Sequence, residues 1–208
     1  MRTVILLAGP SGSGKSRLVR TSGAAQLRLD DFYLDHDAPG LPRRPDGLVD
    51  WDHVDSWNVE AALDALDEVL RTGGCTAPDY SISLSRAQGS HRVELGTRRV
   101  LIAEGIFAPD LLAACRERDI AVTALWLDRS RHANFSRRLR RDLASKRKPP
   151  RVLLERGRRL WREEPDKRRR AVELGFRPIG MRQAIALVQQ LQGVQQLQGE
   201  DHVSRPGR

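Results

Sequence analysis

Residues 3–16 read TVILLAGPSGSGKS, and this stretch decides the fold class of the 208-residue chain. Its first part, Thr3–Ala8, is a short apolar run, which is typical of a buried strand in a parallel sheet. The next eight residues, Gly9–Ser16, fit the pattern G-x-x-x-x-G-K-[ST] of a loop that cradles phosphate groups. Residues 15–21 then have the pattern of a short helix. A strand, a glycine-rich loop and a helix in this order predict a nucleotide-binding site.

The residue types in this loop suit phosphate binding. Glycines let successive backbone N–H groups turn inward around a phosphate, and the N-terminus of the following helix adds partial positive charge. Lys15 is expected to reach the β and γ phosphates of ATP and to assist catalysis, and the Ser16 hydroxyl is expected to be a ligand of Mg²⁺. The residues expected to bind the phosphates are Gly9, Ser11, Gly12, Ser13, Gly14, Lys15 and Ser16.

Strands and helices alternate along the rest of the chain. This alternation predicts an α/β fold of three layers, with a central parallel sheet covered by helices on both faces. Residues 36–50, which are rich in proline and glycine, are expected to form a loop. Residues 76–83 and 91–95 are expected to pair as two short strands around Gly89. Further strands are expected at 26–29, 99–103 and 121–127, and helices at 58–70, 109–116 and 131–144.

A carboxylate at the end of a neighbouring strand is expected to face the metal ion. The run Leu101-Ile102-Ala103 ends in Glu104 and then Gly105, which would let a substrate approach closely. Glu104 is therefore the expected second ligand of Mg²⁺, held directly or through water. Asp128, after the apolar run 121–127, is the alternative.

Charge is distributed unevenly along the chain. Residues 129–170 hold 18 lysines and arginines and five acidic residues, whereas residues 30–68 hold 12 acidic residues and only two arginines. A localised basic segment predicts an anionic partner, either the phosphates of a small molecule or nucleic acid.

A carboxylate near the phosphates is also needed to orient a hydroxyl acceptor and take its proton. Asp30 is the expected base and Asp31 is the alternative.

Several segments resemble the uridine kinases, and they occur in the order found in that family across about residues 1–148. Phosphoribulokinase and pantothenate kinase share the outline. The resemblance implies the P-loop NTPase fold with a helical lid, ATP as co-substrate and Mg²⁺ as cofactor. Besides the phosphate loop, the segments are Leu29–Tyr33 (LDDFY), Val49–Trp57 (VDWDHVDSW), Ile102–Phe107 (IAEGIF) and Ser136–Asp142 (SRRLRRD).

The resemblance also implies roles for single residues. Asp30 matches the catalytic base of the family. Tyr33 and Asp52 match positions that contact the nucleoside, and Tyr80 matches an aromatic residue that touches the base. The basic lid positions, which close on the phosphates and the acceptor, correspond to Arg138, Arg141, Lys146 and Lys148, with Arg141 assigned to ATP and the other three to the acceptor.

One segment departs from the family. Where uridine kinases have Y-D-F-x-x-H-x-R, this chain has Tyr80-Ser81-Ile82-Ser83-Leu84-Ser85-Arg86, one residue shorter and without the second aromatic residue and the histidine. The stacking and the hydrogen bond that those groups give to a pyrimidine are each worth about 1 kcal/mol. This departure puts specificity for uridine in doubt.

A single kinase domain is expected over residues 1–180, with a basic lid at about 131–150. Residues 181–208 are expected to be a helical or frayed glutamine-rich tail, because VQQLQG at 188–193 is repeated at 194–199. The longest uninterrupted apolar run, residues 4–8, is far too short to span a bilayer. Only two cysteines are present, and they favour a reduced, cytoplasmic protein with no membrane partner.

The leading hypothesis is an ATP-dependent kinase of a small hydroxyl compound, with a nucleoside as the first candidate. The alternatives are a kinase of pantothenate or a sugar phosphate, a nucleic-acid-binding ATPase that uses residues 129–170, and a regulator that binds ATP without transfer. Interleaved aromatic residues are scarce in the basic segment, which disfavours nucleic acid. The sequence leaves a homo-oligomer open and does not name the acceptor.

Overall fold

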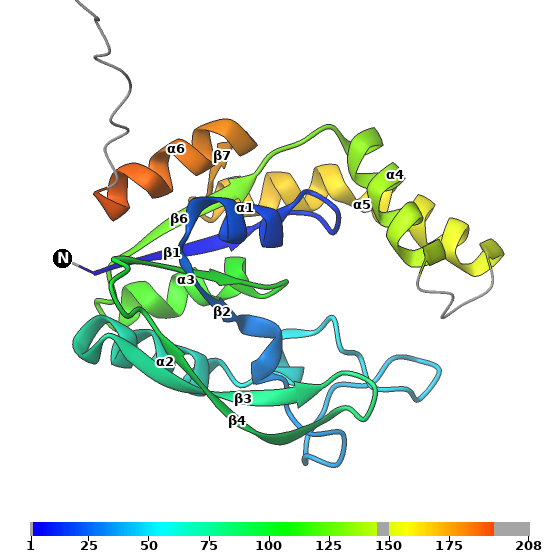
Figure 1. Ribbon diagram of the computed structural model, residues 1–208. Coiled ribbons are helices and arrows are strands. Elements are labelled where there is room, and N and C mark those ends of the chain that lie inside the picture. Colours follow the sequence, from blue (N-terminus) through cyan, green and yellow to red (C-terminus); the bar gives the residue numbers. More distant parts are fainter. Residues whose placement is uncertain (1, 145–149, 194–208) are drawn as a thin grey trace, which may run out of the picture.

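The computed structural model describes residues 2–144 and 150–193 (Figure 1). At its centre is a five-stranded sheet in the order β2-β5-β1-β6-β7, in which all neighbouring strands are parallel. The central strand β1 leads into the phosphate loop. The strands are β1 (Thr3–Ala8), β2 (Ala25–Arg28), β5 (Val100–Glu104), β6 (Val122–Leu127) and β7 (Arg177–Ile179).

Helices cover both faces of this sheet. Along β1, Ile5 and Leu7 belong to the core under α1 (Lys15–Ser22) and α6 (Met181–Gln192). Val4 and Leu6 face the opposite core, which α2 (Val59–Thr72) and α3 (Ala108–Glu117) cover. Side chains alternate between the two faces of a strand, so an entirely apolar strand such as β1 fills both cores. Figure 1 shows the resulting three layers.

Two basic helices, α4 (Arg131–Ala144) and α5 (Pro150–Glu173), pack against each other beside the phosphate loop. Figure 1 shows them extending from the sheet as a helical arm. The predicted fold class is therefore confirmed: a P-loop fold with a central parallel sheet, two helical layers and a helical lid. Neither α5 nor the three-residue strand β7 was predicted from the sequence.

A two-stranded antiparallel hairpin, β3 (Gly74–Ser81) and β4 (Arg86–Glu94), lies below α2 in Figure 1. The pairing of these two segments was predicted, but the turn was not placed correctly. Gly89 lies inside β4, and the chain reverses at residues 82–85, where Ser85 has a φ of +49°. Two short 3₁₀ helices, η1 (Leu29–Phe32) and η2 (Val54–Ser56), flank the connection from β2 to α2.

The last helix, α6, packs against the central sheet. In α6, Ala184 and Val188 are fully buried in the core under α1. The Gln192 side chain accepts hydrogen bonds from the backbone N–H groups of Arg99 and Val100 and donates one to the carbonyl of Gly23. The part of the expected tail that the structure describes is thus a packed helix. The second VQQLQG unit lies outside the described residues.

None of the helices within residues 2–144 and 150–193 combines the length and the apolar character that crossing a membrane requires.

Candidate active site at the phosphate loop

The phosphate loop follows β1 and is held against the start of α4. A Cβ atom on Gly12, whose φ is +91°, would lie 2.6 Å from the backbone oxygen of Asn134 on α4. Because real Cβ atoms do not approach an oxygen so closely, this position requires glycine for its space as well as its backbone conformation. The loop and α4 are therefore in direct backbone contact.

Lys15 lies at the N-terminus of α1 and turns back over the loop. Its Nζ donates to the Gly9 carbonyl at 3.0 Å and lies 3.9 Å from Oε2 of Glu104. Gln26 on β2 donates to the other oxygen of Glu104 at 3.1 Å. The end of β5 therefore presents a carboxylate beside the lysine, held between a cation and an amide. The contact of Gln26 with Glu104 was not predicted, because no local pattern indicates it.

The structure separates Glu104 from its alternative, Asp128. The Asp128 carboxylate accepts two hydrogen bonds from the Arg168 guanidinium on α5, at 3.2 and 2.9 Å. Asp128 therefore ties β6 to the helical arm, whereas Glu104 faces Lys15. This arrangement favours Glu104 as the carboxylate of the phosphate site.

The oxygen ligands at this site suit a magnesium ion. Ser16 is exposed at the start of α1, and Glu104 is half-buried beside Lys15. Within the described residues, no three side chains of His, Cys, Asp or Glu are grouped so that they could hold a metal ion by themselves. Magnesium commonly binds proteins through one or two oxygen ligands together with substrate phosphates. Ser16 and Glu104 fit that mode of binding.

Asp30, which follows β2, lies beside the two residues that come directly after Glu104 at the end of β5. The backbone N–H of Ile106, two residues after Glu104, donates to Oδ1 of Asp30 at 3.4 Å. A Cβ atom on Gly105 would lie 2.8 Å from the same oxygen. The glycine after Glu104 is therefore needed for the close approach of Asp30. Both carboxylates stand at the carboxyl edge of the sheet, where ligands of such folds gather.

Asp31, the alternative to Asp30, points into the protein. Its side chain is only 2% exposed and lies 3.3 Å from the Arg28 guanidinium, but neither carboxylate oxygen has a hydrogen-bond partner in the described structure. Burial raises the pKa of Asp31, and the charge of Arg28 opposes this rise. Asp30 is half-buried and is the more accessible of the two carboxylates.

Aromatic side chains line the region beyond Asp30. The ring of Tyr33 lies 5.7 Å from Trp51, 5.7 Å from Tyr80 and 5.6 Å from Phe107, measured between centroids. The Tyr33 hydroxyl donates to the Trp51 carbonyl, and the Tyr80 hydroxyl donates to the Leu34 carbonyl. The two hydroxyl groups therefore fix neighbouring loops, and Tyr80 is buried.

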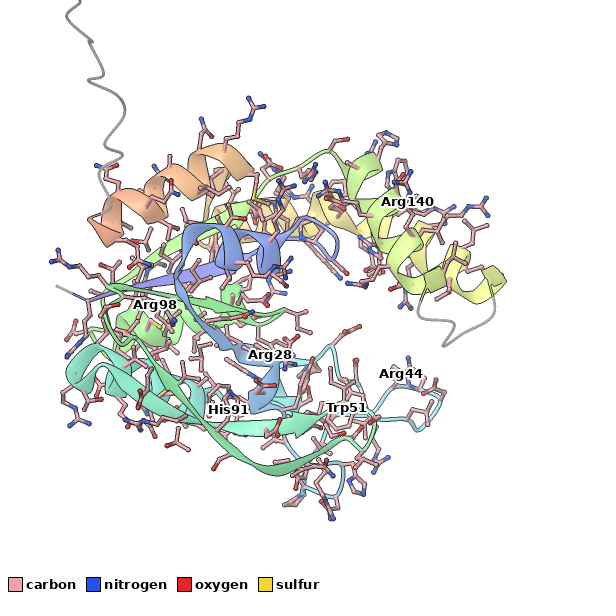
Figure 2. The ribbon with its side chains drawn as sticks, in the orientation of Figure 1. Arg28, Arg44, Trp51, His91, Arg98 and Arg140 are labelled. Carbon is pink, nitrogen blue, oxygen red and sulfur yellow. The ribbon has the colours of Figure 1, made fainter. Side chains whose placement is uncertain are left out.

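Nearby acidic residues affect the pKa of Tyr33. Burial raises the pKa of Tyr33, and the charges of Asp30 and Asp52 raise it further. Burial and then the charge of Asp35 raise the pKa of Tyr80 to about 12. Asp52 is exposed. The structure therefore brings together the predicted residues Asp30, Tyr33, Asp52 and Tyr80, and Figure 2 shows Trp51 below the sheet, across from the helical arm.

The predicted lid arginines contact the phosphate loop itself. Arg138 is 4% exposed, and its Nε and Nη2 donate to the Ser11 carbonyl at 3.2 and 2.9 Å. Arg141 is exposed and donates to the Ser11 hydroxyl at 3.3 Å. A role for Arg138 in acceptor binding stays a prediction, since its guanidinium holds the loop in this structure. Lys146 and Lys148 lie outside the described residues.

A buried polar pair supports this contact from behind. Asn134 on α4 donates from Nδ2 to Glu164 on α5 at 2.8 Å, and both residues are buried. Burial raises the pKa of Glu164, while Asn134 and the charge of Arg138 lower it. Neither residue was predicted from the sequence, because their contact depends on how α4 packs on α5.

A separate hollow of about 460 Å³ lies between the edge strand β7 and helix α6. Its lining includes Arg177, Ile179, Gln183 and Leu187, and none of its lining residues belongs to the candidate site.

No family model matches this sequence, and no curated protein sequence matches it either. Solved structures do match. One from Silicibacter sp. TM1040, described as a "putative fructose transport system kinase", has a TM-score of 0.53 and 20% identity, over 76% of this chain and 79% of that chain. Another, from Bacillus stearothermophilus and described as a "possible uridine kinase", has a TM-score of 0.43 and 19% identity, over 64% and 74%. The first likeness shows a shared fold.

Proposed function

We propose that this protein is an ATP-dependent kinase that transfers the γ-phosphate to a hydroxyl group of a small molecule. One observation carries the proposal: Lys15 and Glu104 lie 3.9 Å apart at the phosphate loop, and Asp30 stands beside the end of the same strand. A phosphate-binding cation, a carboxylate suited to a metal and a separate carboxylate suited to a proton are the groups that phosphoryl transfer needs.

Each group has one task in the proposed reaction. Lys15 binds the terminal phosphates, while Asp30 orients the acceptor hydroxyl and accepts its proton as the oxygen attacks the γ-phosphorus. The bond between the γ-phosphorus and the β–γ bridging oxygen breaks, and ADP leaves with that oxygen. Mg²⁺, held by Ser16 and Glu104, would neutralise charge on the phosphate oxygens. Arg141 on the helical arm contributes positive charge beside Ser11, which stabilises the charge spread over the transferred group.

The acceptor is an uncharged hydroxyl compound in this proposal, with a nucleoside as the first candidate. The negative charges of Asp30 and Asp52 act on Tyr33, so a phosphate or carboxylate on an acceptor bound beside that ring would be repelled. This charge disfavours sugar phosphates and pantothenate. Tyr33 and Trp51 offer ring surface, but Ile82 is 66% exposed where the family has an aromatic residue. Uridine specificity is therefore not part of the proposal.

Ion pairs formed by arginines of the basic segment, residues 129–170, disfavour a nucleic-acid-binding ATPase. Arg168, Arg169 and Arg170 each form an ion pair with an aspartate. The Arg131 guanidinium lies over Trp161 at 4.1 Å from the ring centroid, which covers that aromatic surface. Charges already paired release fewer counterions on binding a phosphate backbone.

The test is a screen of acceptors with the purified protein, ATP and Mg²⁺, following ADP release and identifying the phosphorylated product. The panel contains nucleosides and free sugars, including fructose because of the description of the Silicibacter structure, and pantothenate and sugar phosphates as anionic acceptors. We expect turnover with an uncharged acceptor only. Turnover that is fastest with an anionic acceptor would contradict the proposed acceptor class.

The matched variants for this screen are Asp30→Asn and Asp46→Asn. The first removes the proposed base and should lower turnover about 100-fold or more, with ATP affinity nearly unchanged. The second neutralises an exposed aspartate of the same acidic region, paired with Arg44, and should leave turnover unchanged. Equal turnover of the two variants would remove Asp30 from the mechanism.

A further inference from the structure

Three arginines from separate elements gather on one side of the phosphate loop. Arg17 comes from α1, Arg129 from the connection between β6 and α4, and Arg137 from α4. A Cβ atom on Gly14 would lie 3.9 Å from Nη1 of Arg137 and 3.9 Å from Cβ of Arg17. Burial, followed by the charges of Arg137 and Arg17, lowers the pKa of Arg129. The charges of Arg137 and Arg17 therefore repel the charge of Arg129.

This repulsion is not neutralised by the protein. In the part of the chain that the structure describes, none of the three arginine side chains forms an ion pair or a side-chain hydrogen bond. Other arginines of the helical arm do have carboxylate partners, at Asp142, Asp128 and Asp110. Guanidinium groups that converge without a carboxylate are suited to bind a phosphoryl group.

The cluster is separate from the Lys15–Glu104 pair. Lys15 and Arg17 are two residues apart, about 200° around a helix, so their side chains leave α1 in nearly opposite directions. Lys15 turns toward Gly9 and Glu104. On the other side, Met181 borders Gly14, because a Cβ on that glycine would lie 2.8 Å from its Cε.

We propose that Arg17, Arg129 and Arg137 form a second phosphoryl-binding position, which holds the α-phosphate of the donor nucleotide. In phosphate loops of this kind, the lysine reaches the β and γ phosphates, whereas the backbone cradles the α and β phosphates. An α-phosphate bound by this loop would therefore lie on the side away from Lys15, where the three arginines lie. The inference rests on the proposed binding of ATP. It adds a contact with the α-phosphate, a part of the donor nucleotide that does not react.

Isothermal calorimetry with Mg²⁺ and ATP, without any acceptor, tests this assignment. We expect Arg17→Gln and Arg137→Gln each to weaken ATP binding about 5-fold and the double variant about 20-fold, and the difference from wild type to shrink at high salt. Arg137→Lys, which keeps the charge, should recover part of the loss. The controls are Arg20→Gln on α1 and Arg140→Gln on α4, both exposed (Figure 2 labels Arg140), and both should change the affinity less than 2-fold.

Two further titrations distinguish the source of the phosphoryl group. If the cluster holds the α-phosphate, the double variant should bind pyrophosphate as the wild type does, because the Lys15 side remains intact. If the cluster instead takes a free anion, inorganic phosphate should bind the ATP-saturated wild type and not the double variant, while ATP affinity stays unchanged. That second result would overturn the α-phosphate assignment. Unchanged affinity for both ATP and phosphate would overturn the second position altogether.

The result does not depend on phosphoryl transfer, because no acceptor is present. A protein that binds ATP through the cluster but phosphorylates nothing would contradict the proposed function and leave this inference standing. Circular dichroism melting curves show whether each variant is folded. Arg17→Gln changes an exposed residue, so it keeps the test decisive even if a change at half-buried Arg137 weakens the fold.

Discussion

The two sides of the candidate site are built from opposite chemistry. On the phosphate side, backbone N–H groups, Lys15 and the arginines of the helical arm supply positive charge, and residues 129–170 hold 18 basic and five acidic residues. On the acceptor side, Asp30 and Asp52 supply negative charge near Tyr33, and Tyr33, Trp51 and Tyr80 supply rings. In the proposed reaction this difference would orient the reactants, because a polyphosphate would be attracted to one side and repelled from the other.

The two sides also differ in how they are held. The phosphate loop is fixed by contacts that leave little freedom: Gly12 against Asn134, and the Ser11 carbonyl against Arg138. The acceptor side is assembled from loops whose tyrosine hydroxyls bind backbone carbonyls of Trp51 and Leu34. Under the proposed function, donor binding would therefore depend on a rigid local motif, whereas acceptor choice would depend on loop packing.

We expect the greatest loss of function from a change on the phosphate side. Lys15→Ala removes the ammonium group that is expected to bind the β and γ phosphates, so ATP affinity should fall about 100-fold, which corresponds to about 2.7 kcal/mol. Calorimetry with Mg²⁺ and ATP measures this loss. Arg20→Ala, an exposed cation on the same helix, should bind ATP normally. If both variants bound equally well, the loop would not be the donor site.

A smaller effect is expected where the helical arm meets the loop. Arg138→Met removes both hydrogen bonds to the Ser11 carbonyl, so the loop should lose its fixed shape and KM for ATP should rise about 10-fold. Arg138→Lys keeps one donor and should fall between wild type and Arg138→Met. Steady-state kinetics at varied ATP measures both. A fall in kcat with KM unchanged would instead indicate that Arg138 acts on the transferred phosphate.

A milder change distinguishes the role of Asp31 from that of its neighbour Asp30. Asp31→Asn removes a buried charge without hydrogen-bond partners and should stabilise the protein at pH 7 by about 1 kcal/mol, with turnover retained. Burial raises the pKa of Asp31 above its ordinary 3.8, so wild type loses stability as pH rises through this window. The advantage of the variant should therefore disappear on acidification below about pH 4.

Urea unfolding of both proteins between pH 3.5 and 7 measures this pH dependence. Asp46→Asn, in an exposed position, serves as the control. A loss of stability in Asp31→Asn at neutral pH would show that its pairing with Arg28 outweighs the cost of burial.

The sequence predicted those parts of the fold that are coded by consecutive residues. The strands β1, β5 and β6 each contain a short apolar run. Asn58 and Gly73 mark the ends of α2, where the Asn58 side chain accepts from the Ala61 N–H. Strand β7 escaped prediction because it is three residues long and contains Arg177 and Pro178. Its pairing with β6 defines it, and no local pattern carries that information. Gly89 indicated a turn, but the turn forms at residues 82–85.

The same division applies to the candidate site. The phosphate loop is one uninterrupted motif, and the expected carboxylates Asp30 and Glu104 follow apolar runs. Contacts between distant segments were not predictable: Gln26 with Glu104, Asn134 with Glu164, and Arg138 with the Ser11 carbonyl. The resemblance to the uridine kinases placed Arg138 in the basic lid, but only the packing of α4 on the loop gives its guanidinium a backbone partner.

Gln192 has a consequence for where the protein can be shortened. Its amide group closes the start of β5 and the end of α1 at once, by binding the N–H groups of Arg99 and Val100 and the carbonyl of Gly23. A version truncated at residue 190 would expose these backbone groups and fray the sheet from that corner, whereas one ending at residue 193 would keep the clasp. The first VQQLQG unit thus holds three chain segments together, although its repetitive composition gives no indication of these contacts.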